Sequence, residues 1–263
     1  MVCLADVFFT GESGGDGEVN ETMLERTRHT NSEDVEGNGC RPYIIAVEGA
    51  VGSGKSTLVN NLLEAFGEIG YTCVKTPEAA KVVLMKYAGN DEQEMSTFLS
   101  QIRKTEHYVF FQNEVLQKQI EYENYCRNAD ADIAIVDRTL YSWLYFFTKY
   151  CGVFSYHPIY LRSMELFNGA MNRKHMHDLV VMCDYRDVNW EEMSGRRIRH
   201  RAREDIELAE RKIQHNFLMG LIKSSRFRHM LVSGNVFDRV TQIVTAVVSD
   251  LERRAKEGER SND

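Results

Sequence analysis

A glycine-rich run directly after an apolar stretch is the feature that most constrains the fold of this chain. Residues 43–47 have the composition of a buried strand, and apolar side chains recur at helical spacing from Leu58 to Phe66. The run between them is Glu48-Gly49-Ala50-Val51-Gly52-Ser53-Gly54-Lys55-Ser56-Thr57, which fits G-x-x-x-x-G-K-[ST]. A strand, a tight glycine loop and a helix beginning near Thr57 form the context in which this pattern binds phosphate.

The loop gives its residues specific candidate roles. Glycines allow backbone N–H groups to close around phosphate oxygens, and the helix that follows presents its positive end to the anion. Lys55 would then reach the terminal phosphates, and we expect it to face solvent before a nucleotide binds. The Ser56 hydroxyl would ligate Mg²⁺. The alternative is a glycine-rich turn from strand to helix that binds no ligand.

Length, charge and cysteine spacing exclude several classes of protein. The chain has 263 residues, enough for one large or two small domains, and a formal net charge of -7, which argues against a general nucleic-acid or membrane-surface binder. Its six cysteines form no C-x-x-C pair, so we expect reduced thiols. The N-terminus has no basic region and no apolar run reaches membrane-spanning length. We therefore expect a cytoplasmic protein, with a nuclear location not excluded.

The domain organisation follows from composition. Residues 1–40 are rich in Gly, Glu, Asp and Asn, so we expect a disordered N-terminal tail, because such a segment buries too little apolar surface to offset its ordering entropy. We expect one domain over residues 41–256 and a disordered end over 257–263.

Strand and helix patterns alternate within that domain, which predicts an α/β fold of three layers: a five-stranded parallel sheet with helices on both faces. The expected strands are 43–48, 71–76, 132–137, 178–184 and 228–233, and the expected long helices are 93–127, 138–150, 158–173, 204–223 and 236–256.

Two acidic positions fall at the carboxyl ends of expected strands. Glu78 follows the second strand, where a general base for phosphoryl transfer to a hydroxyl would lie; an acid at a helix N-terminus is an equally good interpretation. Asp137 and Arg138 end the third strand and could supply a Mg²⁺ ligand and a cation for phosphates. A surface ion pair that caps the next helix is the alternative.

Two further patterns could contact substrates. Phe111 could stack on a planar base and Gln112 could pair with its edge, although an aromatic stripe at helical spacing is more often core. The run from Arg196 to Asp205 concentrates arginines after the fourth strand, where a lid could bring them onto phosphates, or where they could form a solvated helix face. No N-K-x-D tetrapeptide occurs, which argues against a GTPase.

Together, these motifs resemble the deoxyribonucleoside kinase family, the group that contains deoxycytidine, deoxyguanosine and mitochondrial-type thymidine kinases. The resemblance covers about residues 42 to 251. It rests on E-G-x-x-G-S-G-K-[ST] at Glu48 to Ser56, P-E at Pro77-Glu78, F-Q at Phe111-Gln112, [DE]-R-[ST]-x-Y-S at Asp137 to Ser142, and R-I-x-x-R-x-R at Arg197 to Arg203.

The resemblance implies roles for these residues. Glu78 would be the base that acts on the nucleoside 5′-hydroxyl, Gln112 would pair with the nucleobase, and Arg138 would contact substrate and phosphates. Arg197, Arg201 and Arg203 would belong to an arginine-rich lid that holds ATP. The implied ATP contacts are Gly49, Ala50, Val51, Gly52, Ser53, Gly54, Lys55, Ser56, Thr57 and these three lid arginines.

The chain departs from the family pattern in two residues. Asp137 stands where the family usually has glutamate, which leaves contact with Mg²⁺ possible through a shorter side chain. Trp143 stands where the family has a small or acidic residue that shapes base preference. We expect Trp143 to fill part of the base pocket and so to favour pyrimidines.

The leading hypothesis is an ATP- and Mg²⁺-dependent kinase that phosphorylates the 5′-hydroxyl of a deoxyribonucleoside, with Lys55, Glu78 and Arg138 as catalytic residues. Its expected partners are nucleoside or nucleotide substrates, without nucleic acid or membrane, and a homodimer is possible. Two alternatives stay open: a nucleoside monophosphate kinase of the thymidylate-kinase kind, and a non-catalytic nucleotide-binding regulator.

Overall fold

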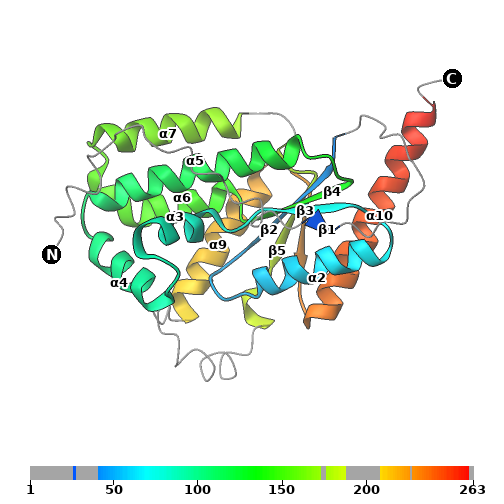
Figure 1. Ribbon diagram of the computed structural model, residues 1–263, viewed down its shortest axis with the longest axis horizontal. Helices are drawn as coiled ribbons and strands as arrows, with labels where there is room; N and C mark the ends of the chain where they lie inside the picture. The colour runs from blue at the N-terminus through cyan, green and yellow to red at the C-terminus, as the bar shows by residue number, and fades with distance from the viewer. Residues whose placement is uncertain (1–25, 28–40, 173–175, 188–207, 226, 261–263) are drawn as a thin grey trace.

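The computed structural model describes residues 26–27, 41–172, 176–187, 208–225 and 227–260 (Figure 1). The strands are β1 (Arg26–Thr27), β2 (Tyr43–Gly49), β3 (Cys73–Lys75), β4 (Ile133–Asp137), β5 (Leu179–Cys183) and β6 (His229–Val232). The helices are α2 (Lys55–Glu68), α3 (Ala79–Ala88), α4 (Glu92–Ile102), α5 (His107–Arg127), α6 (Leu140–Cys151), α7 (Pro158–Met171), α9 (Leu208–Ser224) and α10 (Val236–Arg260), with two short 3₁₀ helices, η2 (Gly152–Phe154) and η3 (Tyr185–Asp187).

The sheet has the strand order β1-β3-β4-β2-β5-β6, in which β2 lies between β4 and β5. The pairs β3–β4, β4–β2, β2–β5 and β5–β6 are all parallel, so the prediction of five parallel strands is confirmed. β1 adds a two-residue antiparallel strand next to β3. It lies in the segment expected to be a tail, and the other residues of 1–40 are outside the described ranges.

Alternating side chains of the central strands enter two separate cores, which produces the three layers. In β2, Tyr43, Ile45 and Val47 pack with α2 and α10 on one face, while Ile44 and Ala46 face the larger core under α5 and α6. Figure 1 shows α2 and α10 together on one side of the sheet, with α3, α5, α6, α7 and α9 on the other. Because β2 is buried on both faces, its end and the loop that follows have a fixed position.

The expected helix over 93–127 is wrong in one respect, since the structure divides it into α4 and α5. The Thr105 N–H donates to the Ile102 carbonyl and the Tyr108 N–H donates to the Thr105 carbonyl, so residues 103–106 form a turn. The turn separates α4 from α5, and α4 packs against α3, which itself packs against α5. α3 was not among the expected helices, and α10 continues to Arg260, beyond the expected domain end at 256.

The predicted lid arginines Arg197, Arg201 and Arg203 lie outside the described residues. None of the helices in the described part of the chain is long and apolar enough to span a lipid bilayer.

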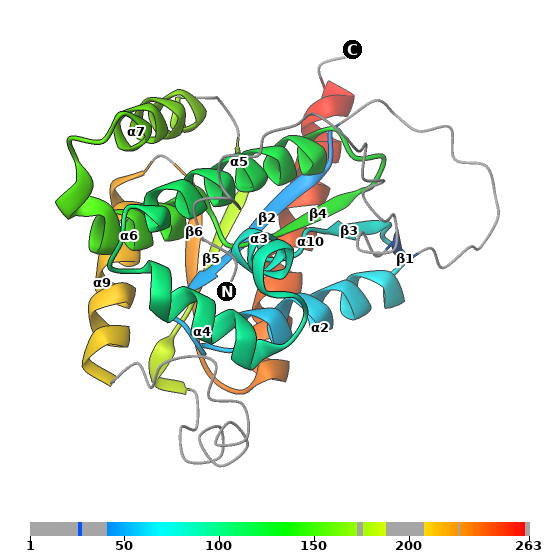
Figure 2. The ribbon, with the colours of Figure 1, turned by 60° about the vertical axis from the view of Figure 1, so that its left-hand side comes forward.

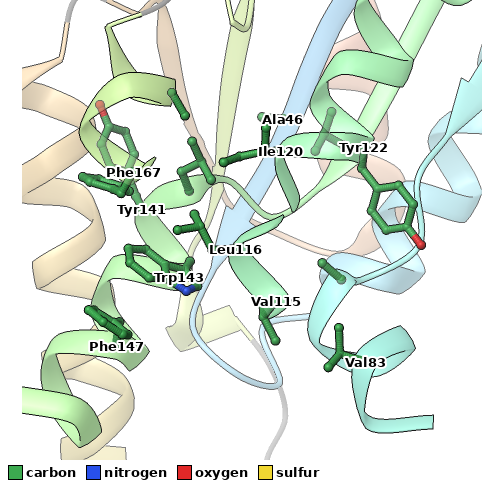
Figure 3. Packing of buried hydrophobic residues seen from close by; sticks show 14 of the residues in the cluster. Ala46, Val83, Val115, Leu116, Ile120, Tyr122, Tyr141, Trp143, Phe147 and Phe167 are labelled. Carbon is green, nitrogen blue, oxygen red and sulfur yellow. The ribbon is translucent and has the colours of Figure 1, made fainter. Parts of the chain in front are cut away.

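Trp143 lies in the larger core. Its ring stacks on Phe147 at a centroid distance of 4.4 Å and on Phe167 at 5.4 Å, and its Nε1–H donates to the Gln112 carbonyl at 2.7 Å. Figure 3 shows the three rings together beside Leu116 of α5. The indole therefore joins α6 to α5 and α7.

We predict that Trp143→Ala lowers the free energy of unfolding by ~3–5 kcal/mol, the usual cost of removing a buried aromatic ring. Urea unfolding measures the change. Trp143→Phe is the matched control, because it keeps an aromatic ring in the stack and loses the bond to Gln112 and one ring of the indole, so its effect should be smaller. Equal stability of Trp143→Ala and the unaltered chain would contradict this packing role.

Candidate active site at the end of the central strand

In the glycine loop after β2, two backbone carbonyls accept hydrogen bonds from Lys55. Gly52 and Gly54 have backbone φ angles of 74° and 80°, which residues with a Cβ rarely adopt, and α2 begins at Lys55. The Lys55 Nζ donates to the carbonyls of Gly49 at 3.0 Å and Ala50 at 2.8 Å. Lys55 is buried, so the expectation that it faces solvent is wrong. In this conformation the Lys55 ammonium donates its hydrogen bonds to loop carbonyls, in the same loop that would bind the phosphates.

The carboxylate of Glu48 connects this loop to the start of α6. It is fully buried, and its Oε1 accepts hydrogen bonds from the Thr139 N–H at 2.7 Å and the Thr139 hydroxyl at 2.6 Å. Its Oε2 accepts from the Ser142 hydroxyl at 2.7 Å and the Gly49 N–H at 3.1 Å. Four donors satisfy one buried anion, so the phosphate loop and the Asp137–Ser142 motif form one unit.

Arg138 adopts a backbone conformation that is uncommon for a residue with a side chain. Its φ angle is 76°, while its N–H donates to the Val47 carbonyl at 3.0 Å and its carbonyl accepts from Gln119 Nε2 at 2.9 Å. Hydrogen bonds on both sides hold the strained residue in place, as is usual for backbone strain at functional positions. The expected helix start at 138 moves to Leu140, because Thr139 caps α6 by accepting the Tyr141 N–H.

Arg138 points its guanidinium at the candidate base. Its Nε donates to Glu78 Oε1 at 2.8 Å, and its NH1 group donates to the Ser142 hydroxyl at 3.2 Å. Glu78 precedes α3, but its side chain makes no capping hydrogen bond to that helix. Arg138 is 8 % exposed, so it does not form the surface ion pair that the sequence allowed as an alternative.

A pocket opens beside this pair and collects most of the predicted substrate residues. Glu78, Phe111, Gln112 and Arg138 line it, together with Val51 of the phosphate loop. The Gln112 Nε2 donates to the Tyr108 hydroxyl at 2.9 Å, while its Oε1 is buried and has no hydrogen-bond partner among the described residues. A buried acceptor of this kind is costly unless a ligand supplies a donor.

Helices α3, α4, α5, α6 and α9 form the walls of the pocket. Figure 2 shows α3, α4 and α9 near the end of β2. Trp143 is absent from the pocket lining, and its ring lies in the larger core with Phe147 and Phe167. The prediction that its ring fills space in the base pocket is therefore wrong. The other walls include apolar and cationic side chains, among them Leu84, Met95, Leu99, Tyr145, Phe146, Lys81, Arg103 and Lys149, and the polar side chains of Ser96, Glu210 and Gln214.

Ser56 and Asp137, the predicted Mg²⁺ ligands, lie together at the start of α2. The Ser56 Oγ donates to Asp137 Oδ2 at 3.3 Å, and Asp137 Oδ1 is buried without a hydrogen-bond partner in the described ranges. Burial, and next the Glu78 carboxylate, raise the pKa of Asp137. Oxygen donors with an unsatisfied carboxylate oxygen suit Mg²⁺. The described residues contain no cluster of three or more His, Cys, Asp or Glu side chains for a metal, so the remaining ligands would be water and phosphate oxygens.

Three residues that the sequence analysis missed hold the loop from α9 and α10. Arg211 Nε donates to the Val51 carbonyl at 2.7 Å, and the Val51 N–H donates to Gln214 Oε1 at 3.0 Å. Arg239 donates from NH1 to the Ser53 carbonyl at 2.9 Å. The sequence analysis named Glu48 only as part of the loop motif and gave it no role. No local pattern marks these residues, because each contact joins positions far apart in the chain.

The strand, loop and helix with a buried lysine on the loop define a P-loop protein of the α/β class. A family model described as an AAA domain matches residues 44–239, which is most of the chain. The chain therefore belongs to this AAA-domain family. No curated protein sequence matches it.

Solved structures with the same fold include a deoxyadenosine kinase from M. mycoides with the products dCMP and a flexible dCDP bound. It is 20 % identical, with a TM-score of 0.50, and the alignment covers 78 % of this chain and 99 % of that one. A second structure found in the comparison is a deoxyadenosine kinase from M. mycoides with bound dATP, at 19 % identity and a TM-score of 0.49, covering 78 % of this chain and 98 % of that one. At this identity the first likeness shows the fold.

We predict that Glu48→Gln lowers the free energy of unfolding by ~1–3 kcal/mol, because the amide replaces one acceptor oxygen with a donor that faces other donors. Urea unfolding tests this. Glu64→Gln on the exposed face of α2 is the matched control and should change stability little. If both variants unfold at the same urea concentration, Glu48 does not join the loop to α6 in solution.

Proposed function

We propose that this protein is an ATP-dependent kinase that transfers the γ-phosphate to the 5′-hydroxyl of a deoxyribonucleoside. The observation that carries the proposal is one pocket, beside the phosphate loop, that is lined by both Glu78 with Arg138 and Phe111 with Gln112. The first pair suits a reacting hydroxyl and the second suits a nucleobase. The resemblance in the motifs supports the same assignment.

In this proposal each residue has a defined task. Glu78 orients the 5′-hydroxyl and accepts its proton as the hydroxyl oxygen forms a bond to the γ-phosphorus, while the bond from that phosphorus to the β-phosphate oxygen breaks and ADP leaves. Arg138, held by Glu78 and Ser142, neutralises charge on the transferred group. Lys55 exchanges its loop carbonyls for phosphate oxygens. Mg²⁺ held by Ser56 and Asp137 would supply charge neutralisation between the β- and γ-phosphates.

Lid arginines on ATP remain part of the proposal. Arg197, Arg201 and Arg203 precede α9, and α9 both lines the pocket and binds the loop at Val51. The assignment of these three arginines to ATP rests on the motif resemblance.

A nucleoside monophosphate kinase is the second candidate, and the cations in the pocket favour it. Lys81, Arg103 and Lys149 line the pocket in addition to Arg138. Lys149 is paired with Glu210 at 3.1 Å, and the Arg103 guanidinium lies over the Tyr150 ring at 5.1 Å. A monophosphate acceptor needs cations for its own phosphate, so these side chains could serve that purpose.

The prediction of a pyrimidine preference depended on Trp143 filling part of the pocket. Because Trp143 does not line the pocket, that reason no longer supports a preference for pyrimidines. Gln112 can accept from an amino group or a ring N–H of either base class.

A radiolabelled-ATP screen against the four deoxynucleosides and their 5′-monophosphates separates these functions. The proposal expects labelled deoxynucleoside monophosphates. Labelled diphosphates alone would identify the second candidate. ATP binding without any labelled product would indicate a non-catalytic regulator.

We predict that Glu78→Gln lowers kcat by ~10²–10⁴-fold, because the amide keeps the size of the side chain but cannot accept the proton. Steady-state kinetics should show a much smaller change in the KM for ATP. Asp137→Asn is the control, since its expected effect is on Mg²⁺ dependence. If Asp137→Asn damages turnover far more than Glu78→Gln at saturating Mg²⁺, the other carboxylate is the base.

We also predict that ATP affinity falls as the pH rises above about 8. Burial, followed by the nearby Arg138 guanidinium, lowers the pKa of Lys55 to about 8. ATP phosphates favour the charged ammonium and raise this pKa, so the complex holds a proton that the free protein has lost. A single proton of this kind limits the fall to about tenfold per pH unit. Calorimetry at pH 7 to 9.5 measures it, with Lys55→Ala as the variant that should bind weakly and lose the dependence. A flat profile in the unaltered chain would contradict the prediction.

A further inference from the structure

Gln214 is a buried amide that does two different things at the boundary between the loop and the pocket. It lies on α9, is 1 % exposed, and lines the pocket with Val51. Its Oε1 accepts the Val51 N–H at 3.0 Å. Because a backbone N–H can only donate, the oxygen must face the loop, and the amino group must face the other way.

The amino group of Gln214 is left without a partner. Within the ranges that the structure describes, Nε2 is buried and makes no hydrogen bond. An amide N–H₂ in this position is costly unless a ligand or water accepts its protons. Gln112 Oε1 shows the opposite need in the same pocket, since it is an acceptor without a donor. A ligand with a donor edge and an oxygen acceptor satisfies both, and a nucleoside has both.

We propose that Gln214 contacts the acceptor substrate directly, with Nε2 donating to an oxygen of the deoxyribonucleoside while Oε1 holds the phosphate loop. The proposal rests on the function proposed above and adds a residue that no motif marks. Since Val51 is the loop residue that lines the pocket, the contacted oxygen belongs to the part of the acceptor nearest the loop, which is its sugar and not its base. Gln214 thereby joins the acceptor substrate to the phosphate loop through one amide.

Two variants separate the contact with substrate from the contact with the loop. Gln214→Glu keeps an oxygen for the Val51 N–H and, as a carboxylate, has no donor for the substrate. Gln214→Met is neutral and of similar volume, and it loses both bonds. Gln117→Glu on the exposed surface of α5 is the matched control for the change in charge. Thermal unfolding checks that each variant is folded.

The measurement is the affinity of the full chain for each of the four deoxynucleosides, by calorimetry. Gln214→Glu and Gln214→Met should both weaken binding of the preferred deoxynucleoside by roughly 5- to 100-fold, the range for leaving a buried polar partner unpaired. Gln117→Glu should bind like the unaltered chain. Gln214→Met should also weaken binding of a non-hydrolysable ATP analogue, because Val51 is released.

Equal deoxynucleoside affinity in Gln214→Glu and the unaltered chain would overturn the proposal and leave Gln214 as a support for the loop only. If Gln214→Glu is unstable, equal affinity in Gln214→Met has the same meaning. Absence of deoxynucleoside binding to the unaltered chain is a different result, because it refutes the proposed function and the substrate contact together.

Discussion

The buried carboxylate of Glu48 is the interaction on which the site depends. β2 delivers it to the centre of the molecule, where water cannot reach it. A charge in that position is tolerated only when donors surround it, and Gly49, Thr139 and Ser142 supply them. Those donors belong to the phosphate loop and to the motif after β4, so satisfying one charge joins the two halves of the site. The strained backbone of Arg138 is held between them.

The strand-level fold was readable from the sequence because the central strands are buried on both faces. The expected ranges match all five parallel strands within two residues at each end. Mostly apolar runs with glycine or acidic ends mark β2, β4 and β5, which are buried along their whole length. The sequence also predicts which residues gather at the carboxyl edge of the sheet, because the carboxyl ends of the parallel strands β2, β3 and β4 lie at the same edge. That rule predicts that Lys55, Glu78, Asp137 and Arg138 lie close together, and in the structure Arg138 donates to Glu78 while, besides burial, Glu78, Arg138 and Lys55 all act on the pKa of Asp137.

What the sequence did not predict depends on tertiary contacts. The turn at 103–106 lies within a continuous helical pattern, and neither a proline nor a glycine marks it. Lys55 was expected to face solvent until phosphates bind, yet it is buried because loop carbonyls satisfy its ammonium. Arg211 and Gln214 belong to a helix far from the loop in sequence, so only the fold reveals that they hold Val51.

Trp143 explains why a motif can locate a pocket without giving its shape. It follows Ser142 directly, but neighbouring helix positions point about 100° apart. Ser142 therefore faces Arg138 while Trp143 faces Phe147 and Phe167. The apolar walls of the pocket come instead from Leu84, Met95 and Leu99 on α3 and α4. Because the chain turns at 103–106, α4 is separate from α5 and packs against α3. One wall of the space available to a base therefore comes from a helix that helical periodicity did not separate from α5.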